Sequence, residues 1–158
     1  MRKDKTILPA QFLNFLTSYL LVFIITACAP QSHLVQGKNY LDKGKYDRAI
    51  KDLERAANEK GDIYHYIDAY TYLGDAYAKN GQANQAMSIY RNALQIIHLR
   101  LREISARRTG IRRELNSKSK VKAQARQDED MRLGDEEWRL KESKKGIKNK
   151  LEGLVEKQ

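Results

Sequence analysis

Two stretches of the chain share one pattern: residues 37–56 read GKNYLDKGKYDRAIKDLERA, and residues 74–93 read GDAYAKNGQANQAMSIYRNA. When the second stretch is aligned on the first, glycine, tyrosine, glycine, alanine and alanine match, and every matched pair is 37 residues apart. Leu53 aligns with Tyr90, so a large side chain recurs as well. A block that recurs at this interval predicts a repeated supersecondary unit, and this unit decides the fold.

The matched residues predict two helices joined by a tight turn in each repeat. The later glycine of each block is expected to end the first helix, where the backbone becomes left-handed. The earlier glycine and the alanines are expected where the helices approach closely, with the tyrosines between them. The pattern resembles the tetratricopeptide repeat. The structural positions that this resemblance implies are Gly37, Tyr40, Gly44, Ala49, Ala56, Gly74, Tyr77, Gly81, Ala86, Tyr90 and Ala93.

The resemblance implies an all-α fold: two helix-turn-helix repeats followed by long charged C-terminal helices, as a helical hairpin or a coiled coil. The interval of 37 residues exceeds the family's usual length of about 34, which places about one extra turn in linker 59–64 or in the second repeat's first helix. Helices are expected at about 32–43, 46–59, 62–79, 83–126 and 130–156.

The last expected helix carries an apolar seam at intervals of seven residues, formed by Leu133, Leu140, Ile147 and Leu154. A seam of this kind suits a partner helix, so this helix either folds back on the preceding one or pairs with another chain. Gly134, Gly146 and Gly153 each cost about 1 kcal/mol relative to alanine inside a helix, which predicts fraying or a break. Trp138 is expected to be a packing residue.

The N-terminus is typical of a secretory signal peptide. Residues 2–5 are mostly basic, an apolar run extends over residues 12–25, and small residues precede Cys28, the sole cysteine. The tetrapeptide Ile25-Thr26-Ala27-Cys28 resembles the lipobox of bacterial lipoproteins. This resemblance implies cleavage between Ala27 and Cys28 and a lipid anchor on Cys28, with no spanning helix. An uncleaved single-pass anchor and an unmodified buried cysteine are the alternatives.

The residue after the cysteine is Ala29 rather than aspartate. By resemblance to Gram-negative lipoproteins, this favours the periplasmic face of the outer membrane. The sequence then divides into a signal peptide, an anchor junction, the repeats, a basic helical extension and a C-terminal amphipathic helix, at 1–27, 28–31, 32–99, 100–126 and 127–158.

The formal net charge of +10 is concentrated in the basic extension, where ten basic side chains accompany two acidic ones. Such a segment can bind anionic surfaces. The candidates are Arg107, Arg108, Arg112, Arg113, Lys118, Lys120 and Lys122. Export removes nucleic acid as a partner and leaves anionic lipid headgroups, lipopolysaccharide phosphates or an acidic protein. The alternative is a solvated helix whose cations pair with the acidic residues of 128–137.

In the tetratricopeptide-repeat family, the first helices of the repeats line a groove that holds a peptide or helix of a partner protein. The corresponding positions in this chain are Lys38, Asp42, Asp68, Thr71, Asp75 and Lys79. Their mixed charge does not match the two-lysine, one-asparagine carboxylate clamp of some chaperone-binding members. The alternative is an ordinary solvated helix face.

No catalytic constellation, metal-ligand spacing or phosphate-binding loop is present in the sequence, so no cofactor, metal site or enzymatic activity is expected. The leading hypothesis is an exported, lipid-anchored adaptor that binds an envelope protein or peptide. A structural protein that oligomerises or lies on the membrane through its C-terminal helices is the alternative. A cytosolic RNA-binding protein is a lesser alternative, which requires the export signal to be misassigned.

Overall fold

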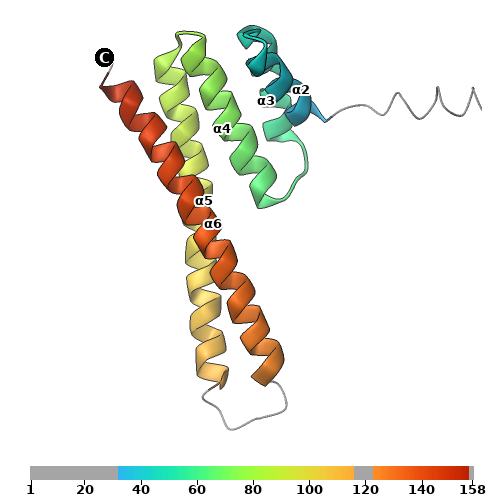
Figure 1. Ribbon diagram of the computed structural model, residues 1–158, viewed down its shortest axis with the longest axis vertical. Helices are drawn as coiled ribbons and strands as arrows, with labels where there is room; N and C mark the ends of the chain where they lie inside the picture. The colour runs from blue at the N-terminus through green and yellow to red at the C-terminus, as the bar shows by residue number, and fades with distance from the viewer. Residues whose placement is uncertain (1–31, 116–122, 157–158) are drawn as a thin grey trace, which may run out of the picture. The chain divides into compact units, whose positions relative to one another are not determined.

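The computed structural model describes residues 32–115 and 123–156, and Figure 1 shows these parts as ribbons. Every secondary-structure element in these two ranges is an α-helix, which confirms the expected all-α fold. The helices are α2 (His33–Asp42), α3 (Tyr46–Asn58), α4 (Ile63–Lys79), α5 (Ala83–Leu115) and α6 (Ala123–Val155). None of these described helices combines the length and the apolarity needed to cross a membrane.

Helices α2 to α4 begin and end close to the predicted residues because their local signals are strong. The Ser32 hydroxyl caps the start of α2, and the Asp62 carboxylate accepts the backbone N–H of His65 at 2.8 Å at the start of α4. Gly44 and Gly81 follow the ends of α2 and α4 with φ angles of 69° and 77°. Glycine enters this left-handed region without a steric penalty, so the predicted helix-turn-helix units are confirmed.

The small residues of both repeats lie at close helix contacts. A Cβ atom on Gly37 would lie 2.5 Å from Leu53 Cγ, and one on Gly74 would lie 2.5 Å from Tyr90 Cε1. Carbon atoms in ordinary contact are about 3.5–4.0 Å apart, so both positions require glycine. The four matched alanines are completely buried, as expected: Ala49, Ala56, Ala86 and Ala93.

The additional length of the repeat lies in a helix rather than in a loop. Helix α4 has 17 residues and α2 has 10, whereas only residues 59–62 connect α3 to α4. Of the two places predicted for the extra turn, the structure therefore selects α4.

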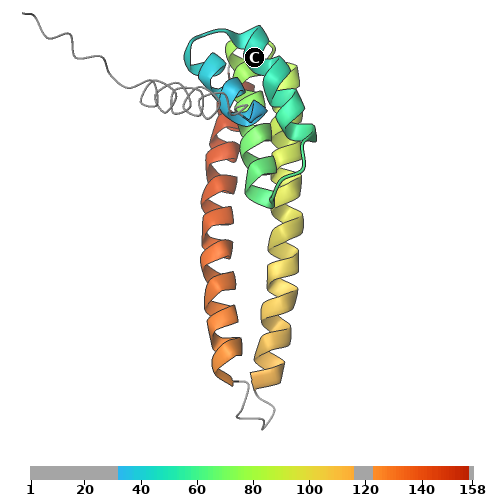
Figure 2. The same cartoon turned by 90° about the vertical axis from the view of Figure 1, so that its right-hand side faces the viewer.

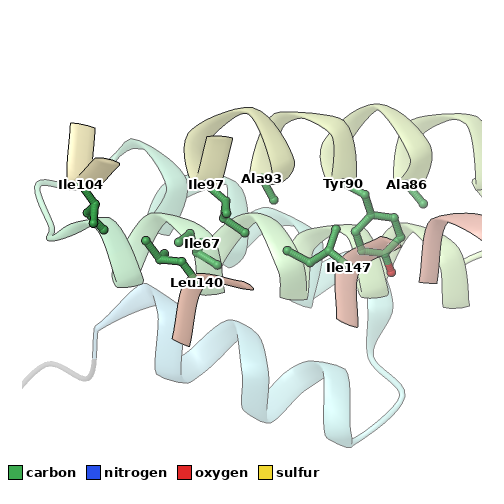
Figure 3. Packing of buried hydrophobic residues seen from close by; sticks show 8 residues of the cluster. All are labelled: Ile67, Ala86, Tyr90, Ala93, Ile97, Ile104, Leu140 and Ile147. Carbon is green, nitrogen blue, oxygen red and sulfur yellow. The ribbon is translucent and has the colours of Figure 1, made fainter. Parts of the chain in front are cut away.

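Two apolar clusters hold the helices together. One joins α2, α3 and α4 around Leu41, Leu53 and Leu73, with Tyr40 packed against it. The other joins α4, α5 and α6 (Figure 3), and it comprises Ile67, Ala86, Tyr90, Ala93, Ile97, Ile104, Leu140 and Ile147. Tyr77 packs against both clusters and donates a hydrogen bond to Glu54 of α3 at 2.7 Å, so it also links the second repeat to the first.

Helices α5 and α6 lie side by side and run in opposite directions (Figures 1 and 2). The seam of α5 repeats every seven residues, and its members are at most 2% exposed: Tyr90, Ile97, Ile104 and Ile111. The predicted seam of α6 faces it, with Leu140 and Ile147 buried and Leu133 and Leu154 packed against the same cluster. The C-terminal helix therefore folds back on α5, which was one of the two predicted arrangements.

Three expectations for this hairpin are wrong. Helix α5 ends at Leu115 rather than near residue 126, and α6 begins at Ala123, so residues 123–126 belong to α6 and not to the basic extension. The glycines of α6 do not break it, because seam packing against α5 offsets their cost.

Candidate functional site

The repeat face consists of the candidate partner-binding residues on α2 and α4. Lys38 and Asp42 of α2 and Asp68 and Lys79 of α4 are exposed. The Lys38 ammonium lies 5.2 Å from the centre of the Tyr72 ring, within reach of a cation–π interaction. Sequence reasoning missed Tyr72, because it lies 34 positions after Lys38 in the sequence and nothing in the sequence indicates that the two are close.

The charges of the repeat face influence one another across the two helices. Hydrogen bonding to Tyr72 raises the pKa of Lys38, and the carboxylates of Asp42 and Asp68 act in the same direction. Desolvation by the surrounding protein raises the pKa of the Asp68 carboxyl, although the Lys38 charge opposes this effect. The structure thus brings a lysine of α2 and an aspartate of α4 together and gives the face mixed charge, as the sequence predicts.

Two of the predicted repeat-face residues are engaged inside the protein. The Thr71 hydroxyl donates to the Ile67 carbonyl at 2.6 Å. Asp75 Oδ1 accepts the Tyr90 hydroxyl at 2.6 Å, and both Asp75 oxygens accept Lys150 Nζ at 2.8 and 2.6 Å. The prediction that Asp75 is available to a partner is therefore wrong, because this carboxylate joins α4 to α5 and α6.

The engaged Asp75 also places α6 beside the repeat face. A depression of about 290 Å³ lies between α4 and α6, and its lining includes Lys79, Asn149 and Lys150. No sequence signal pointed to Lys150, since its partner is 75 residues earlier and only the hairpin brings the two together.

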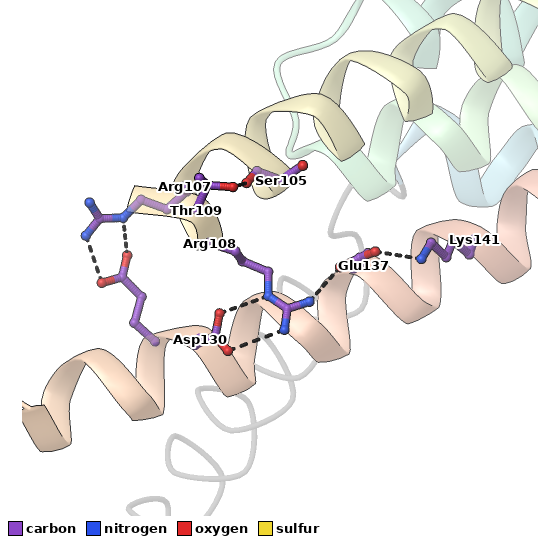
Figure 4. A network of polar contacts seen from close by, with 8 residues as sticks. Ser105, Arg107, Arg108, Thr109, Asp130, Glu137 and Lys141 are labelled. Carbon is purple, nitrogen blue, oxygen red and sulfur yellow. Dashed lines mark hydrogen bonds and ion pairs between the residues drawn. The ribbon is translucent and has the colours of Figure 1, made fainter. Parts of the chain in front are cut away.

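Two arginines of the basic extension, Arg107 and Arg108, are neutralised by carboxylates of α6 (Figure 4). Arg107 donates to both Glu129 oxygens at 2.7 and 2.8 Å. Arg108 donates to Asp130 at 2.9 Å and to Glu137 at 2.7 Å. These arginines lower the pKa of the Glu129 and Asp130 carboxyls through charge-assisted hydrogen bonds.

The expectation that Arg107 and Arg108 present free charge to an anionic surface is therefore wrong, and the predicted alternative of pairing within 128–137 is confirmed for them. Arg112 and Arg113 are exposed and form no ion pair within the ranges that the structure describes. The remaining candidates, Lys118, Lys120 and Lys122, lie outside the described residues, as do Cys28 and Ala27.

The described residues contain no group of three or more histidine, cysteine, aspartate or glutamate side chains that could hold a metal ion. His65 Nε2 lies 2.8 Å from the Ala56 carbonyl oxygen, so this histidine links the end of α3 to the start of α4. Trp138 was expected to be a packing residue, but 65% of it is exposed. The seam at Leu140 and Ile147 faces α5, and Trp138 lies outside it.

Comparison with known protein families agrees with this architecture. The family model of the tetratricopeptide repeat matches residues 30–62 and 67–97. No curated protein and no solved structure is significantly similar to the chain. The matched ranges cover the pairs α2–α3 and α4–α5 as far as Ile97, and the glycine turns and buried alanines of these pairs occupy the expected positions. The two helix pairs therefore have the arrangement of tetratricopeptide repeats, and the family model matches most of their residues.

Proposed function

We propose that this protein is a non-enzymatic adaptor that binds a partner protein on its repeat face and is held at a bacterial envelope membrane by a lipid on Cys28. Tetratricopeptide repeats generally bind protein partners, which supports the first half of the proposal. The observation that carries it is the repeat face itself, where exposed charges of both signs stand on two adjacent helices.

The composition of this face suits a partner segment that also carries both signs of charge. Lys38 offers an ammonium beside an aromatic ring, and Asp42 and Asp68 offer carboxylates within its electrostatic reach. Complementary charge contributes to specificity and to the rate of association more than to affinity. We therefore expect a moderate-affinity contact that weakens as salt is added.

Support for the lipid anchor comes from the sequence of residues 25–28, which resembles a lipobox. Each acyl methylene buried in a bilayer contributes about 0.8 kcal/mol, and two or more chains give stable attachment. Only residues 29–31 separate Cys28 from Ser32 at the start of the repeats. Such an anchor would hold the repeats near the membrane, on the periplasmic face of the outer membrane in a Gram-negative cell.

The anchor is tested by metabolic labelling. Wild type and Cys28→Ala are expressed in bacteria with a palmitate analogue, and the membranes are then fractionated. We expect the label and membrane retention in the wild type and the loss of the label in Cys28→Ala. Label that persists in Cys28→Ala would refute the assignment of the lipid anchor to Cys28, but it would leave the proposal of partner binding unaffected.

The partner-binding face is tested by site-specific photocrosslinking in the native envelope. A photoreactive residue at Asp68, on the repeat face, is compared with one at Lys51, which is exposed on α3. We expect a discrete crosslinked species from the position of Asp68 and none from that of Lys51. Equal crosslinking from both positions would contradict a specific role of the repeat face.

The alternative of oligomerisation through the C-terminal helices has less support. Leu140 and Ile147, the centre of the α6 seam, are buried in a cluster with α4 and α5. An oligomer that used the same seam would have to displace α5 from it.

A further inference from the structure

A groove beside the α5–α6 seam carries unpaired positive charge on both of its rims. It has a volume of about 550 Å³, and Leu94 and Leu99 contribute apolar surface to it. Its cations are Arg91 and Arg102 from α5 and Lys144 and Lys148 from α6. An adjoining depression of about 570 Å³, which shares Arg102 and Lys144, continues the groove toward the loop end of α5. We call this surface the cationic groove.

The charges of the cationic groove differ from those elsewhere on the hairpin. Arg100, Arg107 and Arg108 form ion pairs with carboxylates of α6 at 2.7–2.9 Å. In contrast, no acidic residue lines either depression, and the four cations form no ion pair or hydrogen bond within the described ranges. Uncompensated cations that line one groove create a positive potential there, so this surface favours an anionic ligand.

The apolar surface of the groove indicates that the ligand also has an apolar side. Leu99 is 53% exposed, although a leucine gains about 1.5–3 kcal/mol when it is fully buried. No helix in the described part of the chain covers Leu99. Helix α4 packs on a different side of α5, through the buried cluster around Tyr90 and Ile97. A ligand with apolar side chains would remove this surface from water.

The spacing of the cations fits a helix. Arg91 and Arg102 are 11 residues apart on α5, which corresponds to about 16 Å and three helical turns at 1.5 Å per residue. Lys144 and Lys148 are one turn apart on α6, on the opposite rim. A third helix placed between two antiparallel helices would complete a small bundle, with apolar residues against the seam.

We propose that the cationic groove binds an acidic amphipathic helix of a partner protein. The leucines of the groove would contact the apolar stripe of that helix, and the two cationic rims would contact carboxylates on its flanks. A second copy of this chain fits poorly, because facing copies would bring the same cations together. A bilayer fits less well than a helix, since the apolar surface is recessed between α5 and α6. This surface lies apart from the repeat face.

The proposal is tested with a designed peptide. The full chain, held in nanodiscs of zwitterionic lipid, is titrated against a fluorescent helix of about 18 residues, long enough for about five turns, with a leucine stripe flanked by glutamates. A peptide with lysines in place of the glutamates is the control, and empty nanodiscs give the background. We expect anisotropy to report binding of the glutamate peptide alone and affinity to fall with added salt.

Variants locate the binding. Because like charges across an interface are strongly unfavourable, the pair Arg102→Glu and Lys144→Glu is expected to weaken binding by about tenfold or more. The matched pair Arg112→Glu and Arg113→Glu changes net charge equally outside the groove, and about twofold weakening is expected from its long-range charge alone. Leu99→Ser is expected to weaken binding at unchanged net charge. All variants alter surface positions, and circular dichroism verifies their helicity.

Several results would overturn the proposal. They are the absence of peptide binding, equal weakening by the two charge-reversed pairs, and no effect of Leu99→Ser. The groove would instead be assigned to a membrane surface if the peptide failed to bind and the chain were retained preferentially on anionic vesicles in a way that Lys144→Glu abolished. Self-association abolished by Leu99→Ser, again without peptide binding, would assign it to a second copy of the chain.

Discussion

The close approach of α4 and α5 at Gly74 gives a sharp test of the repeat packing. In Gly74→Ala, the new Cβ would lie 2.5, 2.7 and 2.9 Å from three ring atoms of Tyr90. The ring is 2% exposed, and its hydroxyl donates to Asp75 at 2.6 Å. A shift of the ring therefore disturbs this hydrogen bond as well as the packing of the cluster around it.

The magnitude follows from three opposing contributions. Overpacking a well-filled core costs about 1–3 kcal/mol, and weakening the hydrogen bond between Tyr90 and Asp75 costs about 0.5–1.5 kcal/mol. Replacing a helical glycine by alanine stabilises the helix by about 1 kcal/mol, which offsets part of these costs. We expect Gly74→Ala to lower the free energy of unfolding by about 0.5–3.5 kcal/mol.

The chain supplies a matched control for this substitution. Gly146 lies inside α6, and a Cβ there would have no neighbour within 4 Å. Gly146→Ala should therefore raise the free energy of unfolding by about 0.5–1 kcal/mol. Urea unfolding followed by far-UV circular dichroism measures both variants, and their difference isolates the steric cost. If Gly74→Ala were as stable as Gly146→Ala, the close contact between the helices would be refuted.

Three further predictions concern the polar contacts. Lys150→Met, which breaks the ion pair with Asp75, should lower the free energy of unfolding by about 0.5–1 kcal/mol and accelerate hydrogen exchange at the end of α6, whereas Lys148→Met should do neither. Arg108→Met should cost about 1 kcal/mol at low salt and less at high salt, measured by urea unfolding at two ionic strengths. The hydrogen bond to Glu54 raises the pKa of Tyr77 to about 12. This hydrogen bond should therefore contribute its full stabilisation below about pH 10, the ordinary pKa of tyrosine in an unfolded chain, and the contribution should be lost as the pH rises through 12. In an alkaline unfolding titration, Tyr77→Phe should lose less stability than the wild type.

The repeats could be predicted from the sequence because their signals are local. A glycine with positive φ, an alanine at a helix contact and a capping Asp62 each constrain the backbone within a few residues. The glycine and alanine pattern also recurs, so each copy supports the interpretation of the other. The seam of α6 was visible for the same reason, since its spacing of seven residues requires no knowledge of its partner.

The particular ion pairs between α5 and α6 could not be predicted, because they depend on the register of the two helices. Arg108 reaches Asp130 and Glu137, 22 and 29 residues away, only if α5 ends where it does. With α5 expected to extend to about residue 126, pairing of Arg108 within residues 128–137 was only one of two alternatives, and its particular partners could not be named. Lys144 and Lys148 appeared equivalent to their neighbours in sequence, because the absence of carboxylates around them is a property of the folded surface.

The two ends of the α5–α6 hairpin make different contacts. Two helix pairs of this kind leave an apolar face open, and about three repeat units are usually needed for stability. Helix α6 closes that face, because Leu140 and Ile147 pack into the cluster that contains Ile67 of α4. The loop end is different, since the ion pairs of residues 126–130 are all made with α5. Capping the repeats explains the first end only. The cationic groove begins beside the repeats and extends along α5 as far as Ala106. The ion pairs of the loop end hold α5 and α6 together beyond this groove, so a docking surface accounts for a length of hairpin that capping does not need.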